Sequence, residues 1–253
     1  MGKWISRTSI AALVLATAPA AAEYVGIPGG EFRSMIRYED NDGDVVIQSF
    51  AMMRNAVTNA EFLAFVERHP QWQRGRVPRV FSDTAYLRDW QGPTELGDRA
   101  SERQPVTYVS WYAADAYCKE QDARLPTWLE WEYVAAADET RRDARGDPAW
   151  RRRILTDGML SPASATSSAA NVYGIDGLHG AHWEWVEDYS SLLSVADSRS
   201  QDNGDVLQFC GGAALFFNDL DNYAMLKRVA LLAALRPQNT MGNLGFRCMR
   251  SSP

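Results

Sequence analysis

Two histidines and a glutamate close together in the sequence are the first candidates for metal chemistry. His179 and His182 are three residues apart, and Glu184 follows two residues later. Imidazole nitrogens and a carboxylate oxygen can bind zinc or another transition metal. The alternative interpretation is that both histidines are packed core residues without a metal. We favour the packing interpretation and keep the metal site as the alternative.

The chain also has three cysteines, which are the residues that could support redox chemistry. They are Cys118, Cys210 and Cys248. In an oxidising compartment one pair would form a disulfide, and the third thiol would stay free. A free thiol of this kind is either buried and inert or exposed and reactive.

Residues 1–22 are typical of a secretory signal peptide, which is removed from the mature protein. A basic start, an apolar run and a small-residue cleavage site are present: Lys3 and Arg7, Ile10–Ala18, and Ala20–Ala22. The apolar run is shorter than the roughly 20 residues that span a bilayer, and no later stretch is long enough. We therefore expect a periplasmic or secreted protein with no membrane span and a single domain over residues 23–253.

The composition is acidic, with 26 Lys and Arg against 32 Asp and Glu and a formal net charge of -6. Removal of the signal peptide makes the charge more negative. This balance argues against nucleic acids and anionic membranes as partners. The one basic run, Arg151–Arg153, has Asp147 and Asp157 on either side, and we expect it to lie in a solvated loop.

Short helices are expected to hold the aromatic and polar residues in place. Capping boxes at Thr58–Glu61 and Thr127–Glu130 each predict the start of a helix. A further helix is predicted after Ser110. The first of these helices should end before Pro70, because proline cannot continue a helix interior.

The remaining chain is predicted to be partly extended and partly irregular. Glu31–Ile36 and Val45–Met53 alternate between apolar and polar residues and are expected to be strands. Residues 71–104 contain scattered Trp, Pro and Gly without periodicity and predict a long irregular segment. Residues 138–170 are charged and then rich in Ser and Ala, which predicts a surface loop.

Several sequence segments, taken together in their order, identify a family resemblance. They are VTNAEFLAFV at Val57–Val66, PVTYVSWYAADAYCKEQDARLPTWLEWEY at Pro105–Tyr133, NVYGIDGLHGAHWEWVEDY at Asn171–Tyr189, the pair Gly211–Gly212, and NLGFRC at Asn243–Cys248. This pattern resembles the formylglycine-generating enzymes, also called sulfatase-modifying factors, from about Gly26 to Arg250. The resemblance implies an α+β fold, a variant of the C-type lectin kind, in which short helices and strands are embedded in much irregular chain.

The resemblance also implies a copper-binding cysteine pair that this chain lacks. The parent enzymes oxidise a substrate cysteine with two thiolates of their own, which suit copper(I). In the family these cysteines follow a Gly–Gly pair, and the matching positions here are Phe216 and Asp221. We therefore expect neither copper nor the parent activity.

The segment after those positions is longer than in the parent enzymes and predicts an added helix over Asn222–Leu235. Asp219 or Asp221 is its expected N-cap. The expected apolar face consists of Met225, Leu226, Val229, Ala230 and Leu232. Such a helix would occupy the edge where the family's redox site lies.

By resemblance, Cys118 and Cys248 form a disulfide, which leaves Cys210 free; we expect that thiol to be buried. Arg124 and Arg247 match family positions that we expect to form internal charge-assisted hydrogen bonds. The Asp98–Gln104 stretch matches the rim of the groove that binds extended peptide in the parent enzymes.

Calcium is the cofactor that the resemblance implies for the tryptophan-rich turn. The matching ligands are the carbonyls of Gly180 and His182 and the carboxylate of Glu184, and such oxygen ligands suit this hard ion. Gly177 stands where the family normally has Asn or Asp, which removes one side-chain ligand. We expect a possible structural calcium site with fewer ligands than in the parent enzymes.

These observations predict an exported, non-oxidase member of the family that binds a partner protein or ligand as an accessory or maturation factor. Among relatives, the chain resembles the small periplasmic NirV type, which implies nitrite reductase as a candidate partner. The alternative is a diverged periplasmic oxidoreductase with a relocated active site, for which Cys210 and the turn from His179 to Glu184 are the candidates. A carbohydrate-binding role is compatible with the fold, but the sequence has no motif for it.

Overall fold

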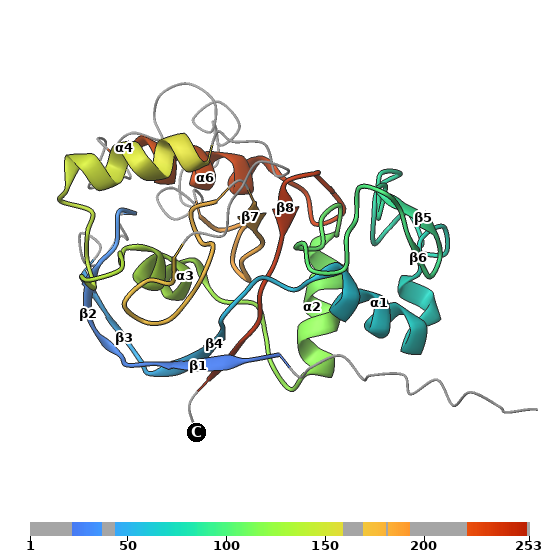
Figure 1. The fold of residues 1–253 in the computed structure, drawn as a ribbon, viewed down its shortest axis with the longest axis horizontal. Coiled ribbons are helices and arrows are strands. Elements are labelled where there is room, and N and C mark those ends of the chain that lie inside the picture. The colour runs from blue at the N-terminus through green and yellow to red at the C-terminus, as the bar shows by residue number, and fades with distance from the viewer. Residues whose placement is uncertain (1–21, 37–43, 159–168, 181, 193–221, 252–253) are drawn as a thin grey trace, which may run out of the picture.

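The computed structural model describes residues 22–36, 44–158, 169–180, 182–192 and 222–251 (Figure 1). Three of its helices begin where the sequence predicts: α1 (Asn59–Arg68), α2 (Trp111–Glu120) and α3 (Trp128–Ala135). Thr58 and Thr127 form complete capping boxes at α1 and α3, and the Ser110 side chain caps α2. These side chains satisfy backbone N–H groups that a helix start leaves unpaired.

Short strands join segments that lie far apart in the sequence. The strands are β1 (Tyr24–Ile27), β2 (Gly30–Arg33), β3 (Asp44–Ile47), β4 (Phe50–Met53), β7 (Trp183–Glu184), β8 (Leu244–Gly245) and β9 (Met249–Ser251). One antiparallel sheet has the order β1-β4-β9, and β2 pairs with β3. The parallel pair of β7 and β8 brings the tryptophan-rich turn against the C-terminal segment.

The predicted strand over Val45–Met53 is divided into β3 and β4, and its partner is divided into β1 and β2. The breaks lie opposite each other, because β1 pairs with β4 and β2 pairs with β3. Gly29 lies at the break, where a Cβ atom would come within 2.3 Å of the carbonyl oxygen of Ile47. Only glycine allows the two chains to approach this closely, so the hairpin bends here into two sheets.

The segment over residues 71–104 is mostly irregular, as predicted, although it contains two very short strands. These are β5 (Trp90–Gly92) and β6 (Glu95–Leu96), which pair with each other, and a 3₁₀ turn at Pro70–Trp72 precedes them. α1 ends at Arg68, before Pro70, also as predicted.

The prediction of a surface loop over residues 138–170 is wrong in its central part. Helix α4 (Pro148–Asp157) carries the Arg151–Arg153 run, which we expected in a solvated loop. Asp147 caps the helix and Pro148 occupies its first turn, a combination that favours a helix start. Trp150 and Ile154, four residues apart, are buried in a small separate core with Ala144 and Ala224. In the sequence, the charged residues on the other face of this helix make the short apolar stripe hard to recognise.

Helix α6 (Tyr223–Ala234) confirms the predicted helix after the Gly–Gly pair. Asn222 is at the N-cap position, without a capping hydrogen bond, and Asp219 and Asp221 lie outside the described residues. Met225, Val229 and Leu232 are buried as predicted. Ala230 is exposed, and Arg228 is buried in its place. Ala230 was therefore a wrong prediction for the apolar face.

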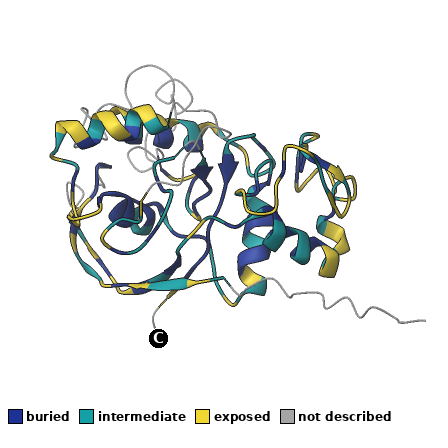
Figure 2. Ribbon diagram, in the orientation of Figure 1, coloured by how far each residue is buried: buried dark blue, intermediate teal, exposed yellow. Residues whose placement is uncertain are grey.

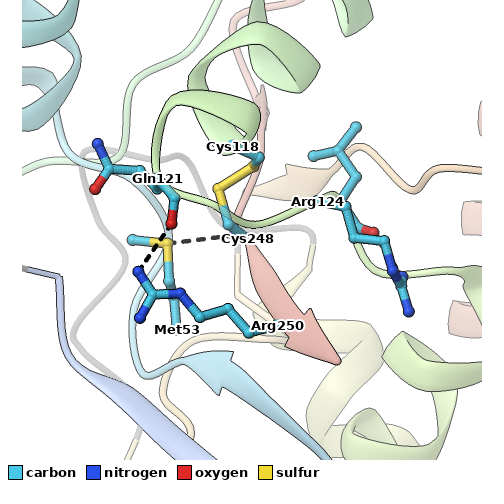
Figure 3. The surroundings of a disulfide bond; sticks show 7 residues. Met53, Cys118, Gln121, Arg124, Cys248 and Arg250 are labelled. Atoms are coloured by element: carbon cyan, nitrogen blue, oxygen red, sulfur yellow. Dashed lines mark hydrogen bonds between the residues drawn. A yellow bond between two sulfur atoms is a disulfide. The ribbon is translucent and has the colours of Figure 1, made fainter. Parts of the chain in front are cut away.

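The disulfide between Cys118 and Cys248 is present, with a Cα–Cα distance of 5.5 Å, and it joins α2 to the end of the chain (Figure 3). The backbone N–H of Cys248 points at the sulfur of Met53 at 3.3 Å. Arg250 donates a hydrogen bond of 2.8 Å to the carbonyl of Gln121 beside the bridge. The predicted pairing of these cysteines is confirmed.

The core combines aliphatic and aromatic side chains, and Figure 2 shows the buried residues on the inner faces of the helices and strands. Its largest fully buried side chains include Trp128, Trp131, Trp185, Phe62 and Phe246. These aromatic residues come from α1, α3 and the segments that follow β7 and β8, so aromatic packing helps to hold the irregular segments together. Within the described ranges, no helix is long and apolar enough to cross a bilayer.

Candidate functional site

A groove of about 490 Å³ lies beside the Asp98–Gln104 segment, which the sequence predicts to be a groove rim. Its walls come from the start of α1, from β5 and from the segments around Thr107 and Gly242. The side chain of His182 also lines it. A volume in this range is typical of sites for small molecules or short segments of peptide.

Asn59, the first residue of α1, fixes one wall of the groove. Its side chain is 3% exposed. The amide nitrogen donates to the carbonyls of Ser101 at 3.0 Å and Gln104 at 3.2 Å. The amide oxygen accepts a hydrogen bond of 3.0 Å from the indole N–H of Trp90. One buried amide thus joins three segments, and the groove wall is formed before any ligand binds.

Another part of the groove lining, at Gly242, depends on close contact between this glycine and Tyr108. A Cβ atom at position 242 would lie 2.8 Å from the Tyr108 hydroxyl oxygen. The backbone N–H of Tyr108 also donates to the carbonyl of Met241 at 2.9 Å. Because a side chain does not fit at position 242, this part of the lining is as closely defined as the wall that Asn59 holds.

His182 supplies the groove with an imidazole ring. Among the described residues, none forms a hydrogen bond with that ring. Burial lowers the pKa of His182, and the nearby Glu184 carboxylate opposes this effect only in part. The ring is therefore neutral at pH 7 and can donate one hydrogen bond and accept another.

Behind His182, Glu184 forms a buried ion pair with Arg247. Their side chains are 2% and 1% exposed. Two guanidinium nitrogens of Arg247 donate to the two carboxylate oxygens at 2.7 and 2.8 Å. The indole N–H of Trp131 donates to the same carboxylate at 2.9 Å. Arg247 also donates to the carbonyls of Met53, Arg54 and Asp176. The predicted internal role of Arg247 is confirmed.

The predicted role of Arg124 is confirmed in the same way. Its guanidinium donates to both carboxylate oxygens of Glu130, at 2.6 and 2.8 Å, and to the carbonyl of Leu125 at 3.0 Å. Glu130 is the acidic member of the capping box at α3. The pair therefore links the start of α3 to the chain before it.

The carboxylate of Glu184 does not fit the calcium-ligand role that the sequence suggested with the carbonyls of Gly180 and His182. Both of its oxygens already accept hydrogen bonds from a cation, so a calcium ion would have to displace Arg247. In the described part of the chain, no group of three or more His, Cys, Asp or Glu side chains is placed to hold a metal ion. Because Arg247 binds both oxygens of Glu184, the described contacts favour the packing interpretation of His179, His182 and Glu184 over the transition-metal site.

We expect calcium to leave the thermal stability of the protein unchanged. The physical reason is that the Glu184 carboxylate is neutralised by Arg247 and has no unshared oxygen for the ion. The melting temperature of metal-free protein should be the same in millimolar calcium as in EDTA, with magnesium as a control. A saturable rise in calcium alone would show that the ion competes successfully with Arg247.

His179 is a packed core residue, as the favoured interpretation predicts. Its ring meets those of Trp150 and Trp131 edge-on, at centroid distances of 5.1 and 6.2 Å. Its Nε2 atom is hydrogen-bonded to the carbonyl of Ala135, so this nitrogen carries the proton. Burial, together with the nearby Arg228 cation, lowers the pKa of His179 to about 3. The ring is therefore neutral across the physiological pH range.

Asp138 lines a second cavity, of about 200 Å³, between α4 and the turn that contains His179. Burial opposes ionisation of its carboxyl group. Hydrogen bonds from the Arg141 side chain and from the backbone N–H groups of Thr140 and Arg141 outweigh that effect and hold the pKa of Asp138 well below its usual range. The ionised carboxylate ties the end of α3 to the segment before α4.

Replacing Asp138 by asparagine should therefore destabilise the protein at neutral pH and destabilise it less in acid. We expect a loss of about 1.5–3 kcal/mol in the free energy of unfolding at pH 7, the usual range for hydrogen bonds to a charged group. The pKa of Asp138 is lower in the folded state, so its contribution is present above about pH 4 and is lost as the pH falls. Urea unfolding at pH 7 and pH 3 measures both effects. The matched control is Glu139→Gln. It removes an exposed ion pair between Glu139 and Arg153, which contributes less than about 1 kcal/mol to stability. An Asp138→Asn loss that is equal at both pH values would contradict this account.

Sequence reasoning missed Arg228, although a signal was present. Residues 225, 228, 229 and 232 follow the spacing of one buried helix face, and position 228 holds the only charged residue of that set. Burial lowers the pKa of Arg228 to about 10, so it remains a cation at pH 7. The role of Asn59 in the groove wall was also missed, because a polar residue inside a capping box is expected at any helix start. Phe216, Asp221 and Cys210 lie outside the described residues.

Comparison with known proteins agrees with the fold and the motifs. A family model described as "Sulfatase-modifying factor enzyme 1-like domain" matches residues 12–252. The formylglycine-generating enzyme of Streptomyces coelicolor is 31% identical, over 88% of this chain and 88% of its own. The "Inactive C-alpha-formylglycine-generating enzyme 2" of Mus musculus is 29% identical, over 90% of this chain and 85% of its own. The solved structure of PvdO from Pseudomonas aeruginosa is 18% identical, with a TM-score of 0.47, over 94% of this chain and 100% of that one. The chain therefore belongs to the sulfatase-modifying factor family, the family of the formylglycine-generating enzymes.

Proposed function

We propose that this protein is an exported accessory or maturation factor that binds an extended segment of a partner protein in the groove beside Asp98–Gln104. It does so without the cysteine oxidation of the parent enzymes. The observation that carries this proposal is the preformed groove of about 490 Å³, whose wall Asn59 fixes by three hydrogen bonds. A wall that needs no ordering on binding retains more of the binding free energy.

The lining of the groove suits a peptide. Asp98, Ser101 and Gln104 offer polar side chains along one wall, and the neutral, half-buried His182 adds an aromatic ring. An extended peptide presents alternating amide groups and side chains, which such a mixed polar and aromatic wall can bind. The groove is thus suited to binding a segment of protein without any metal.

The substitutions at the copper positions support a binding role over an oxidase. Phe216 and Asp221 cannot supply the soft thiolates that hold copper(I), and Cys210 alone cannot make a pair. A relative whose name calls it inactive is 29% identical to this chain along most of its length, so the family scaffold also occurs without the parent activity.

The partner class that we propose is another exported protein. The signal-peptide features of residues 1–22 support export. A copper nitrite reductase is one candidate, because the chain resembles the small periplasmic members of the family that are associated with that enzyme.

Site-specific photo-cross-linking in the exporting host tests this proposal. A photoreactive benzoylphenylalanine replaces Arg99, which is exposed in the groove wall, and in a matched control it replaces Val46, which is 67% exposed on β3. We expect the groove position to give one cross-linked species, which mass spectrometry maps to a single extended segment, and the control to give none. Equal cross-linking at both positions would contradict a specific groove.

A turnover assay tests the second half of the proposal. The purified protein, supplied with copper(I), oxygen and a cysteine peptide of the kind that the parent enzymes oxidise, should form no formylglycine. Copper-dependent turnover would show that the parent chemistry persists and would overturn the proposed function.

Replacing Asn59 by alanine should weaken both the groove and the fold. The variant leaves the Trp90 N–H without its partner, whereas the carbonyls of Ser101 and Gln104 keep hydrogen bonds from backbone N–H groups. A buried polar group left unpaired costs about 1–3 kcal/mol. We expect urea unfolding to show a loss in that range and cross-linking from position 99 to fall. Gln91→Ala, an exposed change on β5, is the control and should alter neither result. Undiminished cross-linking by a folded Asn59→Ala variant would show that the groove wall does not position the partner.

A further inference from the structure

Two buried arginines and one buried carboxylate lie in the part of the core between β7 and α6. Arg247 is 1% exposed, Arg228 is 5% exposed and Glu184 is 3% exposed. Both oxygens of Glu184 bind Arg247 directly. Arg228 forms no ion pair with Glu184 or with any other described residue. The described core therefore carries an excess positive charge at Arg228.

The guanidinium of Arg228 is only partly satisfied by the protein. One terminal nitrogen donates to the carbonyl of Leu178 at 2.9 Å. The group also lies over the ring of Trp131 at 4.5 Å and near that of Trp183 at 5.9 Å. Its Nε atom is buried and has no hydrogen-bond partner in the described part of the chain. A buried cation with an unpaired N–H group is costly unless an anion compensates it.

A small cavity lies beside this guanidinium. Its volume is about 20 Å³, and its lining includes Arg228, Lys227, His179, Trp183, Ala224 and Gly158. Space of this size holds a group about as large as one water molecule. No acidic side chain is among its described lining residues, and Lys227 adds a second positive charge. Lys227 is exposed, so one of the lining residues lies at the surface.

We propose that this cavity binds a carboxylate group, presented by a small organic acid, which completes the charge of Arg228. The planar guanidinium and a carboxylate match each other in geometry, and such charge-assisted hydrogen bonds are strong. The cavity admits one carboxylate oxygen, and the rest of a formate, acetate or longer acid would extend out of it toward Lys227. This site is separate from the groove and does not depend on the function proposed for it.

Thermal unfolding in sodium acetate, with sodium chloride added to keep the ionic strength constant, tests the proposal. The wild-type melting temperature should rise saturably with acetate, because a ligand that binds only the folded state stabilises it. In Arg228→Met the rise should disappear or need about tenfold or more acetate. Arg152→Met, the same substitution at an exposed position of α4, is the matched control and should respond like wild type.

A second variant keeps the test valid if Arg228→Met does not fold. Ala224→Leu fills the cavity from α6 while leaving both cations in place, and it should also abolish the response. The proposal is overturned if wild-type protein shows no saturable response to acetate, or if the response survives in both cavity variants. A titration with chloride, at an ionic strength held constant with an inert salt, should not raise the melting temperature in the same saturable way. If chloride raises the melting temperature as much as acetate does, the assignment to carboxylates is overturned.

Discussion

Replacing Glu184 by glutamine is expected to lower the free energy of unfolding by about 3–5 kcal/mol, the usual cost of removing one partner of a buried ion pair. The carboxylate is 2% exposed and accepts two hydrogen bonds from Arg247. Without it, two buried arginine cations would face each other with no described carboxylate between them. Urea unfolding monitored by tryptophan fluorescence measures the loss, because Trp131 donates to the same carboxylate.

Glu187→Gln is the matched control for this prediction. Glu187 has a side chain that is 46% exposed and lies 3.3 Å from Arg124. An exposed ion pair of this kind is worth about 0–1 kcal/mol. If both substitutions cost the same, the Glu184 pair does not carry the stability that its burial implies.

Removing the disulfide is expected to have the second large effect. A variant with both Cys118 and Cys248 replaced by serine should lose about 2–5 kcal/mol in free energy of unfolding, as for other native bridges. The bridge joins residues 130 positions apart, and restricting a loop of that length removes much conformational freedom from the unfolded chain. Urea unfolding of the variant and of wild-type protein under non-reducing conditions measures the difference.

Cys210→Ser is the control for that experiment. The thiol of Cys210 is not part of the bridge, so its removal should leave the unfolding midpoint unchanged. Reduced wild-type protein should behave like the double serine variant. If the reduced protein were as stable as the oxidised one, the bridge would not stabilise the fold by restricting the conformations of the unfolded chain.

The sequence predicted the parts of the fold that depend on local signals. The capping boxes at Thr58 and Thr127 located two helices, because side chain and backbone satisfy each other within four residues. The disulfide and the fold were predicted from the family resemblance. The order of the motifs along the chain identified the family, whereas hydrophobic periodicity indicates only individual helices and strands. Helix α4 was missed because only Trp150 and Ile154 face inward, too few to stand out among charged neighbours.

The candidate sites were harder to predict because they depend on long-range contacts. Glu184 reads as a free carboxylate in the sequence, and only the parallel pairing of β7 and β8 places Arg247 against it. Asn59 reads as a helix residue until Trp90 and the Asp98–Gln104 segment fold over it. In both cases the partner is more than 30 residues away, beyond the reach of any local pattern.

The position of the C-terminal segment has a consequence for the order of folding. β9 pairs with β4, β8 pairs with β7, and Arg247 contacts carbonyls from Met53 to Asp176. Residues 244–251 therefore complete contacts with segments that precede them by up to about 200 positions. Chains dominated by such non-local contacts fold slowly. The core can thus close only after these residues have been synthesised.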